Sequence, residues 1–313
     1  MRGGAGESGY LVAGCFGKLP FGPEYLDANV VFPVSRAFRD WIRNGRQAAG
    51  MGADSQEGRV PPETSPMRFL YAPSASGEML AGVIRPSADI GGKRQFPFTV
   101  FVHVPKRNWT RSYAMLPLAV NPVWDALDDL WDSVATAASE RAFREILAAA
   151  RVPAPIPPGD AKAIYDAGQG QVAARVFDGE LGTSVEALRT NLPDLLRSLK
   201  SRPQDMRVEL PAGADHESAS YDTAFWVDLF NRQFFWKRFE PTIFIGGAPR
   251  QVDRTVFLLF GDPAPSDYAR LLGIVREHPA YLRPAHRPAG SPPSVFAGTA
   301  PTYADLASTR FVA

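Results

Sequence analysis

The chain has 313 residues, 45% of them hydrophobic and 21% charged, which is the balance of a globular protein that buries a real core. The net charge of +1 argues against nucleic-acid binding, because a surface that follows phosphates leaves a basic excess. The single cysteine excludes an internal disulfide and fits a reducing compartment. We find no signal peptide and no run near the roughly 18 apolar residues of a membrane span, and therefore expect a cytoplasmic protein without membrane insertion.

A short buried strand and an amphipathic helix are the first predicted elements. Behind a flexible N-terminus at residues 1–9, the apolar run Tyr10–Phe16 predicts a strand that ends in the proline-containing loop Gly17–Pro23. A helix is expected from about Ser35, as its N-cap, to about Gly50. Its apolar face would carry Phe38, Trp41 and Ile42, with the arginines and Asp40 mostly on the other face.

Three strands and two helices are predicted after a polar linker at residues 52–66. The strands are expected at Met67–Ala72, Met79–Arg85 and Phe96–Val104. The last is nearly continuous in β-branched and aromatic residues, which predicts a central strand covered on both faces. One helix should start at Asn121-Pro122, with the amide as cap and the proline at the first helical position, and another should run from about Ser139 to Ala150.

The proline-rich stretch at 152–159 predicts a connector between two parts of the chain. It would separate a first α/β domain at 10–151 from a second α/β segment at 160–277, and a Pro/Gly-rich, partly disordered tail would follow at 278–313. The elements expected in the second segment are a helix over Thr183–Lys200 opened by a capping box, strands at 206–210, 241–246 and 255–261, and helices at 221–235 and 266–275. The fold class is therefore α/β, a mixed β-sheet flanked by helices as in an αβα sandwich, with a second, smaller αβ segment.

Catalytic and metal constellations are missing from the sequence. There is no phosphate-binding glycine loop, no metal-ligand spacing among the histidines, and no Gly-x-Ser-x-Gly turn around a nucleophile. We therefore expect no metal, no cofactor and no enzyme activity. The sharpest remaining enzyme hypothesis joins Cys15 to His103, against the alternative of a buried structural cysteine and a core histidine.

Two further clusters have a structural and a functional interpretation. The acids Asp125, Asp128, Asp129 and Asp132 crowd one predicted helix, either as a solvated face near its positive end or as an acidic recognition strip or a cation site. Seven aromatic residues between Phe225 and Phe239 predict core packing, or in part an exposed surface for a partner. We favour the structural interpretation of both.

Two charged, proline-stiffened turns that leave predicted core strands are the strongest candidates for a binding site. In the first, Lys18 and Pro20 follow the opening strand. In the second, Phe96 can anchor in the core while Arg94 reaches an acid such as Asp89 or Glu24. Such turns either present a docking face or form an ion-pair network that pins the loops together.

Three motifs in this order resemble the TagF (ImpM) family of proteins associated with bacterial type VI secretion systems. The first is Phe16-Gly-Lys-Leu-Pro20 followed by Glu24-Tyr25 and the tryptophan-containing helix. The second is Gly82-Val-Ile-Arg-Pro-Ser-Ala-Asp89 with Arg94-Gln-Phe-Pro-Phe-Thr99, and the third is Trp236 with Pro241-Thr-Ile-Phe244. The resemblance extends over roughly residues 10–275.

The resemblance implies a post-translational regulator, generally a repressor, that engages cytoplasmic components of the secretion apparatus, such as a forkhead-associated scaffold protein. We therefore expect a non-catalytic accessory protein that works by protein–protein binding. The candidate partner-binding residues are Lys18, Pro20, Glu24, Tyr25, Asp89, Arg94 and Phe96. Two alternatives stay open: an anion- or nucleotide-sensing, enzyme-like domain that uses Lys18 and Arg94, and a stoichiometric structural subunit of the apparatus.

Overall fold

The structure is a computed structural model in which residues 9–50, 66–92, 94–178, 206–233, 240–246, 254–272 and 281–282 are described. The helix predicted over Thr183–Lys200 lies outside these residues. So do nearly all of the linker at 52–66 and all of the tail at 278–313 except the two residues of a short strand.

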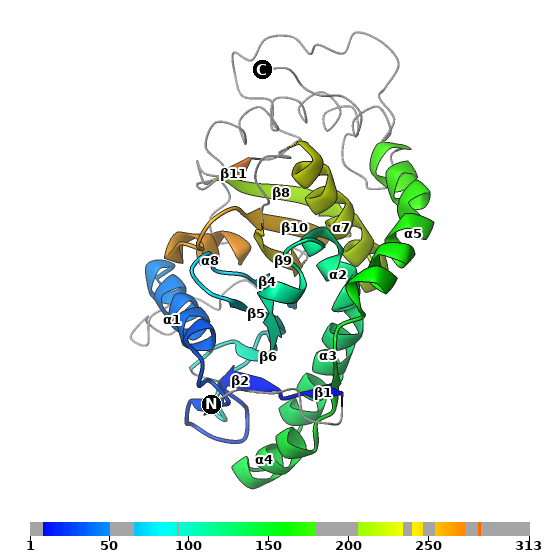
Figure 1. Cartoon of the computed structure of the whole chain (residues 1–313). Helices are drawn as coiled ribbons and strands as arrows, with labels where there is room; N and C mark the ends of the chain where they lie inside the picture. The colour runs from blue at the N-terminus through cyan, green and yellow to red at the C-terminus, as the bar shows by residue number, and fades with distance from the viewer. Residues whose placement is uncertain are drawn as a thin grey trace.

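A nine-stranded sheet forms the centre of the protein, with the order β11-β8-β10-β9-β4-β5-β6-β2-β3 (Figure 1). Its strands are β2 (Gly14–Gly17), β3 (Leu26–Ala28), β4 (Met67–Tyr71), β5 (Glu78–Arg85), β6 (Phe98–Pro105), β8 (Arg207–Ala212), β9 (Thr242–Gly246), β10 (Arg254–Leu259) and β11 (Tyr281–Leu282). Neighbouring strands are antiparallel, except that β11 runs parallel to β8. A separate two-stranded sheet pairs β1 (Tyr10–Leu11) with β7 (Val152–Pro153).

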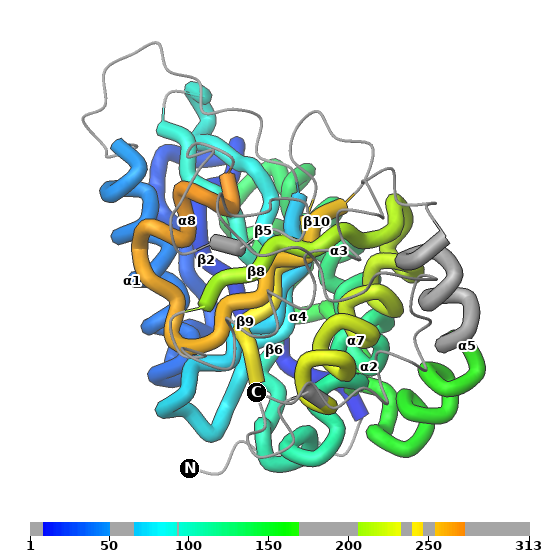
Figure 2. The backbone as a smooth tube through the Cα atoms, turned by 90° about the horizontal axis from the view of Figure 1, so that it is seen from above, coloured from blue at the N-terminus to red at the C-terminus, as the bar shows by residue number. Residues whose placement is uncertain are grey.

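Helices cover both faces of the large sheet, which confirms the αβα sandwich (Figure 2). One face packs on α1 (Pro33–Ala48) and α8 (Pro265–Leu271). The other packs on α3 (Asn121–Ala135) and α7 (His216–Gln233), while α2 (Leu116–Ala119) and α5 (Pro158–Asp178) pack on α7 and α4 (Glu140–Ala149) packs on α3. Side chains of a strand alternate between these faces, so Phe69 packs with α1 while Leu70 packs on the α3 side.

The two segments predicted on either side of 152–159 contribute strands to the same sheet. β4 of the first pairs with β9 of the second, in a register that sets Phe69 opposite Phe244. The connector itself begins as β7 and continues into α5, a helix that the sequence did not predict. Whether the two segments fold as separate units stays a prediction, but in the folded protein their strands are continuous.

The helix starts differ from two of the predicted caps. Ser35 lies inside α1, where its hydroxyl donates to the Phe32 carbonyl at 2.9 Å, and Pro33 occupies the first turn. Asn121 does not cap α3, because its amide oxygen accepts hydrogen bonds from Arg68 and Ser220 instead. α4 begins where predicted, and the Ser139 hydroxyl caps it by accepting from the Ala142 amide at 3.2 Å.

None of the helices described in the structure combines the length and the apolar character that a membrane crossing needs.

Candidate functional site

The two charged turns meet at one end of the large sheet. β2 ends at Gly17 and pairs with the start of β6, while β5 ends at Arg85, directly opposite Phe98. Gly17 has a φ of +137°, and a β-carbon there would lie 2.3 Å from the Pro97 carbonyl oxygen, so only glycine allows this close exit. The turns that leave β2 and β5 are therefore neighbours in space.

Hydrogen bonds join the first turn to the second. The Ser87 hydroxyl donates to the Lys18 carbonyl at 2.6 Å, and the Ile90 amide donates to the Gly22 carbonyl at 3.3 Å. The Lys18 ammonium and the Arg94 guanidinium both donate to the Pro23 carbonyl, at 2.6 and 3.3 Å. We call the surface formed by the seven candidate residues the turn face, namely Lys18, Pro20, Glu24, Tyr25, Asp89, Arg94 and Phe96.

The predicted contact between Arg94 and Asp89 is confirmed. The guanidinium Nε lies 2.9 Å from Asp89 Oδ2, and the Arg94 backbone amide donates to Oδ1 at 3.2 Å. Asp89 is buried, whereas 57% of the Arg94 side chain is exposed. Glu24 is exposed and makes no ion pair with any residue that the structure describes, so it takes no part in this contact.

Burial and neighbouring charges set the ionisation of this cluster. Burial lowers the pKa of Lys18, and the adjacent Arg94 cation lowers it further, against the opposing effect of Asp89 and Glu24. Burial opposes ionisation of Asp89, but the hydrogen bonds and the charge of Arg94 outweigh it and lower the pKa of the Asp89 carboxyl. The pKa of Lys18 in the first turn and that of Asp89 in the second are therefore each shifted by a charge of the other turn.

Two aromatic rings complete the turn face. Tyr25 and Phe96 pack edge to face with centroids 5.1 Å apart, and both are half-buried against the α1 side of the core. The Tyr25 hydroxyl is buried without a hydrogen-bond partner among the described residues, and burial raises its pKa. Pro20 is exposed in the first turn. The structure thus brings Lys18, Tyr25, Asp89, Arg94 and Phe96 together, whereas Pro20 and Glu24 make no side-chain hydrogen bond or ion pair with another described residue.

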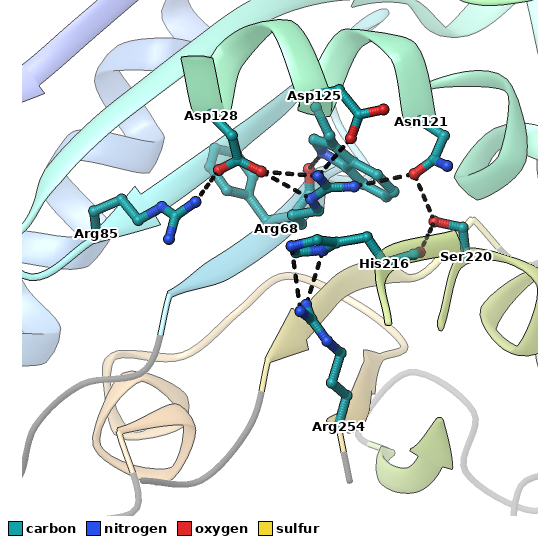
Figure 3. A network of polar contacts seen from close by, with 10 residues as sticks. Arg68, Arg85, Asn121, Asp125, Asp128, His216, Ser220 and Arg254 are labelled. Atoms are coloured by element: carbon teal, nitrogen blue, oxygen red, sulfur yellow. Dashed lines mark hydrogen bonds and ion pairs between the residues drawn. The ribbon is translucent and has the colours of Figure 1, made fainter. Parts of the chain in front are cut away.

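A second polar cluster, which sequence reasoning missed, surrounds Arg68 under α3 (Figure 3). The guanidinium of Arg68 donates to Asp125 at 2.7 Å, to Asp128 at 2.8 and 3.1 Å, and to Asn121 at 3.0 Å. Only 5% of the Arg68 side chain is exposed, so these bonds replace its lost hydration. Arg85 also pairs with Asp128. We call this set the Arg68 network.

Ser220, which donates both to Asn121 and to the His216 carbonyl, links the Arg68 network to the His216–Arg254 pair of the second segment. The two arginine Nη atoms lie 2.8 and 3.2 Å from the imidazole nitrogens, and Arg254 Nε donates to the Ala214 carbonyl at 2.7 Å. Burial, and then the Arg68 and Arg254 cations, lower the pKa of His216 to about 4. The Ser220 hydroxyl of α7 donates to the Asn121 amide oxygen of α3 at 3.0 Å, so the network also links α3 to α7.

The remaining sequence hypotheses are resolved by position. Cys15 faces the α3 side of the sheet and His103 the α1 side, so they form no pair, and burial raises the pKa of the Cys15 thiol to about 12.

The solvated interpretation of the acidic helix fails for Asp128, because this carboxylate binds two arginines. Phe225, Trp226 and Phe230 are core residues as expected, whereas Phe234 to Phe239 lie outside the described residues. Across the described ranges, no three His, Cys, Asp or Glu residues could hold a metal ion.

Comparison with known proteins agrees with the predicted resemblance. Residues 14–150 match the family model described as the TagF N-terminal domain, type VI secretion system-associated. No curated protein matches the chain. Among solved structures, the chain is similar to the crystal structure of PA0076 from Pseudomonas aeruginosa PAO1, with 26% identity over 46% of this chain and 64% of that chain, and a TM-score of 0.37. The match therefore spans less than two thirds of that protein.

The family match covers β2 to α4 and includes the first two of the motifs noted in the sequence. Over residues 14–150, the chain therefore matches the TagF N-terminal domain, a type VI secretion system-associated family model.

Proposed function

We propose that the protein is a non-catalytic, cytoplasmic regulator that represses assembly of a type VI secretion system by docking its turn face on a component of the apparatus. The observation that carries this proposal is the junction of the two turns. Lys18, Arg94 and the Pro23 carbonyl hold them in one rigid surface, on which the Arg94 side chain remains 57% exposed. A preorganised, charged and partly aromatic surface at strand ends suits protein recognition.

The chemistry of the site favours binding over turnover. The Lys18 ammonium is occupied by a backbone carbonyl, and Asp89 balances the charge of Arg94. This arrangement also weakens the alternative of an anion or nucleotide sensor that uses these two cations. The buried Cys15 thiol, whose pKa burial raises to about 12, is a poor nucleophile at neutral pH.

The proposal predicts opposite effects of removing and adding the protein in its host bacterium. Deletion of the gene should raise the amount of a type VI substrate in the culture supernatant, and overproduction should lower it, while the cellular amounts of the apparatus proteins stay constant. A partner such as a forkhead-associated scaffold protein should be captured in less than equimolar amounts. Unchanged secretion in both strains would contradict regulation, and loss of secretion on deletion, with fixed-ratio co-purification, would identify a structural subunit instead.

A further inference from the structure

Four arginines follow one line along α1. Arg36, Arg39, Arg43 and Arg46 are spaced by three, four and three residues, which places them on one side of the helix. At a rise of about 1.5 Å per residue the line is about 15 Å long. The opposite side of α1 is the buried one that packs on the sheet.

This arginine line is continuous with the turn face. The Arg43 guanidinium lies over the Tyr25 ring at 5.9 Å from its centroid, and that of Arg46 lies over the Phe96 ring at 5.0 Å. Arg46 also donates to the Gln95 carbonyl at 2.5 Å, directly beside Arg94 in the chain. The two aromatic rings of the turn face therefore support the last turns of the arginine line.

The combined surface carries more positive than negative groups. Its cations are the four arginines of α1 with Lys18 and Arg94, and its carboxylates are Asp27, Asp40, Glu24 and Asp89. Asp27 and Asp40 both lie within 3.3 Å of Arg39. Neither Arg36 nor Arg43 has a carboxylate of the described residues within 4.0 Å, and both are exposed.

We infer that the α1 arginine line and the turn face together form one basic docking surface that binds an acidic segment of a partner protein. This inference rests on the proposed function and names the chemistry of the partner. Exposed guanidinium groups pair with carboxylates in a bidentate way, and complementary charge steers association and sets specificity. A length of about 15 Å fits about five extended residues or about ten helical ones, so a short run of Asp and Glu is sufficient.

A labelled acidic peptide tests the surface directly. A fluorescein-labelled peptide of about ten glutamates is titrated with the whole protein, and binding is followed by fluorescence anisotropy at low and at physiological salt. The Arg36→Glu/Arg43→Glu variant should bind about tenfold or more weakly, because each reversal replaces an attraction by a repulsion, and added salt should shrink the difference. Arg36→Lys/Arg43→Lys should retain most of the binding of the wild-type protein.

The control is Arg141→Glu/Arg144→Glu on α4, which changes the net charge equally at two exposed arginines on the opposite side of the large sheet from α1. This control should bind the peptide within about threefold of the wild-type protein. Equal losses in both double variants would overturn the inference, because only net charge would then matter. Tighter binding of a single-stranded oligonucleotide with the same dependence on Arg36 and Arg43 would also overturn it, in favour of nucleic acid.

The outcomes separate this inference from the proposed function. Peptide binding that depends on Arg36 and Arg43, in a protein that leaves secretion unchanged on deletion and overproduction, would support the surface and reject the regulator. If the protein regulates secretion but the Arg36→Glu/Arg43→Glu variant binds the peptide as well as the α4 control does, the regulator is supported and the docking surface is rejected. Thermal unfolding of every variant verifies that the fold is intact before binding is compared.

Discussion

The Arg68 network and the basic surface of α1 contain the same residue type in opposite situations. Arg68 is almost completely buried, and each of its nitrogens donates to a carboxylate or an amide oxygen. Arg36 and Arg43 are exposed, and no carboxylate of the described residues pairs with them. The comparison shows that desolvation decides the role of an arginine: a buried one is committed to holding elements together, and an exposed one stays available for a partner.

The two regions should therefore respond in opposite ways to substitution. Removing one member of a buried ion pair leaves an uncompensated charge, which costs far more than the pair itself contributes. Removing an exposed, unpaired charge changes stability little but alters long-range attraction. Substitutions in the first region should act on folding and those in the second on binding.

The largest expected effect is that of Arg68→Leu. It removes a buried guanidinium, leaves the half-buried Asp128 with Arg85 as its remaining cation and takes a donor from Asn121, so we expect a loss of about 3–5 kcal/mol in the free energy of unfolding. Urea denaturation followed by circular dichroism measures it. Asp125→Asn is the control within the same network, because Asp125 is 61% exposed and should cost less than about 1 kcal/mol. Similar small losses for both would show that Arg68 is not a structural centre.

Acidification should weaken the same network through His216. Its pKa in the folded protein is about 4, below the ordinary value of 6.5, so the unfolded chain takes up a proton first as the pH falls. The stability that the neutral imidazole contributes is complete above pH 6.5 and is lost as the pH falls towards about 4. After a discount for partial exposure, this amounts to about 1–2 kcal/mol.

His216→Gln isolates this contribution, since glutamine can still bond to Arg254 but does not titrate. The free energy of unfolding of the wild-type protein should fall more steeply than that of the variant between pH 7 and pH 4.5. The carboxylates, including Asp89, add an acid loss that is common to both proteins. Parallel curves would show that His216 titrates normally in the folded state.

The sequence carried different amounts of information about these two regions. The arginine spacing on α1 is readable directly, because a helical face needs only local periodicity. Strands such as β5 and β6 were predictable from their unbroken apolar runs, which a sheet buried on both faces requires. The contacts of Arg43 with Tyr25 and of Arg46 with Phe96 were not, because they join elements whose relative orientation only the folded sheet defines.

The sequence contains a pattern that indicates the Arg68 network. Arg68 is a single charge inside an otherwise apolar strand, and Asn121, Asp125 and Asp128 share one helix face at intervals of four and three residues. Together they predict a buried charge in the strand and a polar helix face whose side chains need hydrogen-bond partners. Pairing the two requires knowing that the Arg68 side chain of β4 reaches α3 in the folded protein, which depends on contacts distant in sequence. The role of Asn121 as an acceptor instead of a cap depends on the same contacts.

A smaller effect is expected at the turn face. Arg94→Ala removes the partner of a buried carboxylate, but the exposure of Arg94 limits the loss to about 1 kcal/mol in the free energy of unfolding. Glu24→Ala, which removes an exposed acid without a described ion pair, should change it by less than about 0.5 kcal/mol. A loss above about 3 kcal/mol for Arg94→Ala would mean that the turn pair is mainly structural, like the Arg68 network.

A small effect on stability is also expected for Arg36→Glu/Arg43→Glu, which should lower the free energy of unfolding by less than about 1 kcal/mol, since it removes the contact of Arg43 with the Tyr25 ring. Urea denaturation alongside the α4 double variant measures it. A much larger loss would place these arginines with Arg68 among the structural residues and remove the contrast between the two regions.

Secretion in the host bacterium tests the docking surface most directly. Cells that lack the gene are complemented with the wild-type protein, with Arg36→Glu/Arg43→Glu, or with Arg141→Glu/Arg144→Glu, at equal protein levels, and a type VI substrate is quantified in the supernatant. The account predicts that the wild-type protein and the α4 variant restore repression while the α1 variant leaves secretion high. Equal repression by all three proteins would contradict it.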